Sequence, residues 1–125
     1  MNKRQLGNTN INLTAIGFGG APLGNLFENL DERNCYDILE KTYNEGINIY
    51  DTSPLYGYGL SEHRLGNFLK TVDEESYFLS TKVGRYLTPA KKESIDRGRF
   101  AGSLNFSPNL DYSYDGVMRA FEQSL

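Results

Sequence analysis

Three side chains of the sequence could share a proton: Asp51, Tyr56 and Lys82. Asp51 ends the apolar run of residues 47–51, Tyr56 lies in the loop that follows, and Lys82 ends a second apolar run at residues 77–82. An ammonium beside a phenol favours the phenolate form, and a carboxylate keeps that ammonium charged and in place. Such a phenol can give or take the proton that moves when a carbonyl is reduced or an alcohol is oxidised.

The spacing of these residues predicts that the acid and the amine face each other. Side chains alternate between the two faces of a strand, so Asp51 shares a face with Ile49, and Lys82 shares one with Ser80. The carboxyl ends of parallel strands carry the loops that bind and react. A second interpretation of the same residues remains open, in which Asp51 and Lys82 form a structural ion pair and Tyr56 only packs its loop.

The elements that would position these residues alternate along the chain. The patterns predict strands at residues 13–18, 47–51 and 77–82, and helices from the N-cap Asp31 to Gly46, from the cap Ser61 through Leu65, Phe68 and Leu69, and from about 115 to the end. A turn-rich cluster within residues 4–14 predicts a small hairpin before them. Strand and helix in alternation require a parallel sheet made of βα units.

The long connection at residues 84–114 is harder to place. It mixes prolines, glycines and charges with Phe100, Leu104 and Phe106, which makes it more apolar than a linker needs to be. Two interpretations remain for it: a lid over the site, or a surface loop.

Composition limits the class of protein. The chain has 125 residues, 38% of them hydrophobic, and a net charge of −3, which predicts one globular domain over residues 1–125. Mixed charges provide no basic stripe for a nucleic acid, and no apolar stretch reaches the length of a membrane span. The N-terminus lacks the apolar core of a signal peptide, so we expect a cytoplasmic protein.

Two single residues carry little chemistry. Cys35 is the one cysteine, so the chain holds no internal disulfide, and its neighbours predict a buried helical position. His63 is the one histidine, and a lone histidine on a helix makes no metal site. Glu62 beside it is expected to be structural, either at the helix dipole or as an anchor for its loop.

Several motifs together resemble the aldo-keto reductase family. Residues 46–53, Tyr56-Gly57 and residues 61–66 resemble the family signature, and residues 80–84 resemble its catalytic-lysine strand. Residues 17–24, 79–85 and 111–116 are most similar to the branch that contains the D-threo-aldose 1-dehydrogenases, the L-fucose dehydrogenases and the pyridoxal 4-dehydrogenase-like enzymes.

The resemblance implies a fold, a cofactor and a reaction. The fold would be the N-terminal portion of a (β/α)8 barrel, with about three βα units and a small N-terminal hairpin. The cofactor would be NADP or NAD, with Gly20 and Ala21 near its nicotinamide, Tyr56 as the acid–base residue, and Asp51 and Lys82 beside both. The substrate would be a small sugar oxidised at C1 to a lactone, or another aldehyde or alcohol.

The resemblance also implies what this stretch of sequence lacks. The family has a further catalytic histidine at the end of the fourth barrel strand, and the pattern to Leu125 supplies three strands of eight. We therefore expect the chain alone to be inactive and to self-associate through exposed sheet edges. A truncated, inactive product and a non-catalytic binding module are the alternatives to an N-terminal piece of an enzyme.

Overall fold

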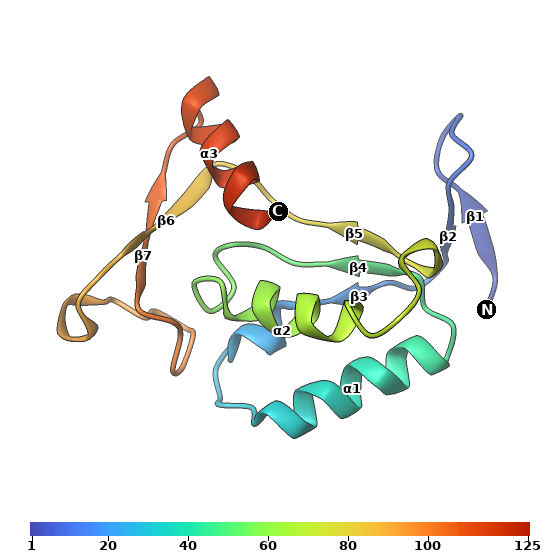
Figure 1. Cartoon of the computed structure of the whole chain (residues 1–125), viewed down its shortest axis with the longest axis horizontal. Helices are drawn as coiled ribbons and strands as arrows, with labels where there is room; N and C mark the ends of the chain where they lie inside the picture. Colours follow the sequence, from blue (N-terminus) through green and yellow to red (C-terminus); the bar gives the residue numbers. More distant parts are fainter.

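The computed structural model describes all 125 residues and has a three-stranded parallel sheet at its centre (Figure 1). Strands β3 (Phe18–Gly19), β4 (Ile49–Asp51) and β5 (Phe78–Ser80) lie in that order, and Asp51 is paired with both Gly19 and Ser80. Helices α1 (Glu32–Asn44) and α2 (Leu60–Leu69) make the two crossovers and cover one face of the sheet (Figure 1). The predicted βα alternation is confirmed.

The core lies between this face and the two helices. Tyr50 is fully buried there, and it points to the opposite side of β4 from Asp51. The other buried members are Leu23, Cys35, Leu39, Leu65, Phe68 and Leu69. The predicted apolar face of α2 and the buried position of Cys35 are thus both confirmed.

The two crossover helices begin in different ways. The Asp31 side chain accepts a hydrogen bond of 2.8 Å from the backbone N–H of Asn34, as expected of an N-cap. The cap predicted at Ser61 is wrong, because α2 begins after Gly59, whose φ of 96° only glycine adopts readily. Ser61 lies inside the first turn, and its hydroxyl is free to bond elsewhere.

The N-terminal hairpin is confirmed, with β1 (Lys3–Gln5) antiparallel to β2 (Asn12–Thr14). The strand predicted at residues 13–18 is divided, since residues 13 and 14 belong to β2 and Phe18 begins β3. Asn48 ties the hairpin to the sheet, because its Oδ1 accepts a 2.8 Å hydrogen bond from the Thr14 backbone N–H.

The long connection contains a second hairpin that the sequence pattern did not predict. Strands β6 (Arg85–Pro89) and β7 (Phe106–Leu110) pair antiparallel and project away from the sheet (Figure 1). Helix α3 (Tyr114–Ser124) follows, as expected, and the Gln123 amide bonds to both the N–H and the carbonyl of Leu87 on β6. None of the helices combines the length and the apolar character needed to cross a bilayer.

Candidate active site

The carboxylate and the ammonium predicted to face each other do so at the carboxyl end of the sheet. Lys82 lies two residues beyond the end of β5, and its Nζ donates to Asp51 Oδ1 at 2.5 Å and to the Thr52 carbonyl at 2.9 Å. Ser80 Oγ donates to the other carboxylate oxygen of Asp51 at 3.1 Å. The two charged side chains are 44% and 43% exposed, so the pair stands at an open edge of the fold.

The surroundings of Lys82 favour its charged form. Burial lowers the pKa of Lys82, but its contacts with Asp51 and Tyr56 outweigh burial, so the pKa stands above its ordinary value. The side chain therefore carries a positive charge at neutral pH. Because both partners are partly exposed, water and salt screen the pair, and it contributes little to folding.

Tyr56 completes the group. The Lys82 Nζ lies over the Tyr56 ring, 4.8 Å from its centroid, a distance typical of a cation–π contact. The Tyr56 loop is short and tightly bent: Gly57, Tyr58 and Gly59 all have positive φ, and the Ser61 N–H bonds to the Tyr56 carbonyl at 3.1 Å. The structure thus brings together all three residues that the sequence predicted as catalytic.

Gly20 and Ala21, predicted to lie near a nicotinamide, occupy the loop after β3. The Gly20 N–H donates to the Asp51 carbonyl at 2.7 Å, and its own carbonyl accepts from Ser61 Oγ at 2.7 Å. A Cβ at Gly20 would lie 2.8 Å from Ser61 Oγ, which explains why glycine is required there. Ala21 begins the 3₁₀ helix η1 (Ala21–Gly24). Their role toward a cofactor stays a prediction.

The end of the sheet is open beside Gly19. A Cβ placed on Gly19, the strand partner of Asp51, would meet nothing within 4 Å. Open space here, next to the half-exposed Asp51 and Lys82, fits a nicotinamide approaching the strand ends. The residues present are therefore compatible with the predicted cofactor.

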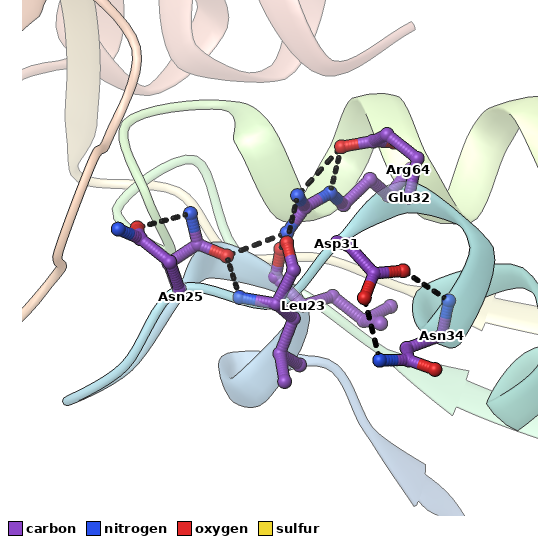
Figure 2. Close-up of polar contacts among 8 residues, drawn as sticks. Leu23, Asn25, Asp31, Glu32, Asn34 and Arg64 are labelled. Atoms are coloured by element: carbon purple, nitrogen blue, oxygen red, sulfur yellow. Dashed lines mark hydrogen bonds and ion pairs between the residues drawn. The ribbon is translucent and has the colours of Figure 1, made fainter.

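Two residues of α2 contribute contacts that the sequence pattern did not identify. Arg64 is 8% exposed and makes five hydrogen bonds, to Leu23, Asn25, Leu30 and twice to Glu32 (Figure 2). Its spacing of three residues from Ser61 places both on the buried face of α2, which was the signal that could have found it. Glu62 accepts a hydrogen bond from Thr81 Oγ1 at 2.7 Å, so its role is structural, as expected, but the loop that it anchors is the one before Lys82.

A separate cavity of about 380 Å³ lies between α2, the β6–β7 hairpin and α3. His63 and Glu62 line it, and His63 is on the exposed side of α2. None of Asp51, Tyr56 and Lys82 lines this cavity. Asp51, Tyr56 and Lys82 therefore stand at the open carboxyl end of the sheet and not inside this cavity.

Comparison with known proteins gives consistent matches along the chain. The model of the Aldo/keto reductase family matches residues 15–125. Pyridoxal 4-dehydrogenase of Microbacterium luteolum is 43% identical over 132 residues, which cover 98% of this chain and 38% of that protein. D-threo-aldose 1-dehydrogenase of a Pseudomonas species is 47% identical over 77 residues, 62% of this chain and 23% of that protein.

A solved structure agrees with these matches. The holo form of an aldo-keto reductase from Bacillus halodurans superimposes with a TM-score of 0.74 at 30% identity, covering 100% of this chain and 35% of that one. The chain thus spans well under half the length of each of these proteins.

Proposed function

Because the chain belongs to the aldo/keto reductase family, we propose that it carries the acid–base part of an NADP- or NAD-dependent oxidoreductase site. Its three parallel strands form part of a (β/α)8 barrel, as the sequence predicted. The chain covers 38% of its pyridoxal 4-dehydrogenase relative, so the proposed activity belongs to a barrel in which further strands complete the site.

One observation carries the proposal: the Lys82 ammonium is held by Asp51 and lies over the Tyr56 ring. In oxidation, Tyr56 takes the proton of the substrate hydroxyl, and in reduction it returns a proton to the carbonyl oxygen. Lys82 stabilises the Tyr56 phenolate, which takes the proton in oxidation and remains after the proton is given in reduction. Asp51 keeps Lys82 charged and in place. A bound nicotinamide supplies or accepts the hydride.

The names of the relatives support the choice of substrate class. One is named for pyridoxal and one for D-threo-aldoses, and both names describe an aldehyde or its sugar equivalent. We propose that the substrate is a small aldose, oxidised at C1 to a lactone, or another compound with an aldehyde or alcohol at the reacting carbon. The half-exposed Asp51 and Lys82 leave that carbon free to approach Tyr56.

A chimeric enzyme tests this proposal. Residues 1–125 would replace the matching segment of the Microbacterium luteolum pyridoxal 4-dehydrogenase, and reduction of NAD(P)+ by pyridoxal and by aldoses would be followed by absorbance. We expect turnover from the chimera and only background from the 125-residue chain, whose sheet is open at β3 and β5.

Tyrosine variants of the chimera decide the role of Tyr56. Tyr56→Phe should lower kcat by about 10²- to 10⁴-fold, the usual contribution of a positioned proton-transfer group. Tyr112→Phe is the matched control, since Tyr112 is 68% exposed, and it should leave kcat unchanged. A Tyr56→Phe chimera as active as its parent would refute the assignment.

A further inference from the structure

Arg64 uses all of its hydrogen-bond donors on the β3–α1 segment and on the first residue of α1. A guanidinium has five N–H donors, and the five bonds of Arg64, at 2.6 to 2.8 Å, use them all. Three of these bonds go to the segment between β3 and α1: the carbonyls of Leu23 and Leu30, and Asn25 Oδ1 (Figure 2). The other two go to Glu32, whose side chain is 75% exposed. A lysine, with three donors from one point, cannot replace this set.

The loop that Arg64 holds touches the backbone of Tyr56. Gly24 lies between Leu23 and Asn25, and a Cβ built on it would stand 2.5 Å from the Tyr56 carbonyl carbon and 2.6 Å from the Gly57 nitrogen. Such a distance means that the two backbones are in direct van der Waals contact. The position of η1 therefore limits where the Tyr56–Gly57 peptide can lie.

The same loop also limits the ring of Tyr56. The Asn25 carbonyl accepts a 2.9 Å hydrogen bond from the Ala101 N–H, in the tip of the β6–β7 hairpin. Phe100 is the preceding residue, and its ring centroid lies 6.2 Å from that of Tyr56. Arg64 thus reaches both sides of Tyr56, through Gly24 on the backbone and through Asn25 and Phe100 on the ring.

We propose that Arg64 is a positioning residue for Tyr56: by fixing Leu23 and Asn25, it sets the place of the Tyr56 ring against the Lys82 ammonium. This inference rests on the role proposed for Tyr56. It concerns the position of the Tyr56 ring, which can be measured without an activity assay. None of the five hydrogen bonds of Arg64 goes to Tyr56 or Lys82, so its effect passes through the loop.

Proton NMR of the 125-residue chain measures this geometry directly. Because Lys82 lies over the Tyr56 ring, the ring current moves its ε-methylene signal upfield of the other lysines. The Lys82 signal is identified as the one that disappears in the Lys82→Arg variant. The Tyr56→Leu variant gives the chemical shift of the same ε-methylene group without the ring. Arg64→Lys should lose most of the upfield shift while the helix content by circular dichroism is kept.

A matched control separates positioning from loss of charge or of fold. Arg33 forms an exposed i,i+4 pair with Asp37 at 4.0 Å, so Arg33→Lys should leave the Lys82 signal in place. If Arg64→Lys does not fold, Asn25→Gly replaces it: Asn25 has a φ of 62°, which glycine adopts freely, and the change removes one acceptor of Arg64. Asn25→Gly should lose part of the shift.

Two results would overturn the inference in different ways. An Arg64→Lys or Asn25→Gly chain that melts earlier but keeps the full Lys82 shift would show that Arg64 only supports the fold. A wild-type chain without any upfield shift would remove the Lys82–Tyr56 contact, and with it both this inference and the proposed function. The first result leaves the proposed function standing.

Discussion

Replacing Ser61 by alanine removes a hydroxyl that joins the ends of two strands beneath the site. Ser61 is fully buried, its Oγ donates to the Gly20 carbonyl at 2.7 Å, and it shares a 2.9 Å hydrogen bond with Thr52 Oγ1. The Thr52 carbonyl in turn accepts a bond from Lys82. The variant therefore tests how firmly the strand ends that carry the site are held.

The two lost bonds do not cost the same. The Gly20 carbonyl keeps a 3.0 Å bond from the Leu23 N–H, so it is not left unsatisfied. The Thr52 hydroxyl, in a residue that is 2% exposed, loses its side-chain partner. One buried hydroxyl without a partner and one weakened carbonyl bond together lower the free energy of unfolding by about 1–2 kcal/mol.

Urea unfolding, followed by circular dichroism, measures this loss. A decrease of that size moves the midpoint to lower urea by about 1 M for a chain with an m-value of roughly 1–2 kcal/mol/M. Ser124→Ala is the matched control, because Ser124 also lies at a helix end but its buried hydroxyl has no partner, so its midpoint should stay or rise. Equal midpoint changes in the two variants would refute the reasoning.

Two further outcomes test the core and the loop. Burial, aided by Tyr43, raises the pKa of Tyr50 to about 12. The stability that the buried, neutral Tyr50 side chain contributes to the fold is therefore complete below its ordinary pKa near 10 and is lost as pH rises through 12. Over that interval wild type should lose roughly 2–3 kcal/mol more than Tyr50→Phe does, as followed by circular dichroism against pH. Gly24→Ala should lower the melting temperature, because its Cβ would strike the Tyr56 backbone, whereas Gly66→Ala in α2, with nothing within 4 Å, should raise it. Identical alkaline curves, or equal melting temperatures for the two glycine variants, would contradict these expectations.

The elements predicted correctly are those with local signals. Helix α1 has an acid at its N-cap and a glycine with a φ of 82° just past its end, and both act within a few residues of the helix. Strand alternation is equally local, and it places Ser80 beside Asp51, its partner in β4. Lys82 was predicted to end the same strand, but β5 ends at Ser80, so the loop after β5 is what brings the Lys82 ammonium to Asp51.

The hairpin of β6 and β7 was not predicted because the strand and turn signals in its sequence are weak. Each strand contains a proline, Pro89 and Pro108, which lowers the strand signal of its segment. The strands are joined by a long segment and not by a two-residue turn, so no turn motif marks their pairing. The connecting segment also packs on Tyr56 and Tyr58 through Phe100, and sequence spacing does not show these contacts.

The supports of the site were missed for a different reason. Ser61 and Arg64 bond to the carbonyls of Gly20 and Leu23, and each of these contacts spans 41 residues of sequence. A backbone carbonyl has no side chain to mark it in a sequence, so no pairing pattern could reveal it. The only signal was that two polar residues, Ser61 and Arg64, share the face of α2 that carries its buried apolar residues. The preference for serine at a helix N-cap favoured a cap at Ser61 instead.

The site has an exposed part, the Asp51–Lys82 pair, and a buried part, Ser61 and Arg64, and the two have different functions. The Asp51–Lys82 pair is about 44% exposed and is screened by water, so its removal should change chemistry far more than stability. Ser61 and Arg64 are almost fully buried and hold both ends of η1 from one helix, Gly20 on one side and Leu23 on the other. Because η1 is bonded to α2 at two points one turn apart and its Gly24 packs on the Tyr56 backbone, the loop that carries Tyr56 is held by the core. Asp51 and Lys82, which the strand ends themselves position, can stay open to a substrate beside it.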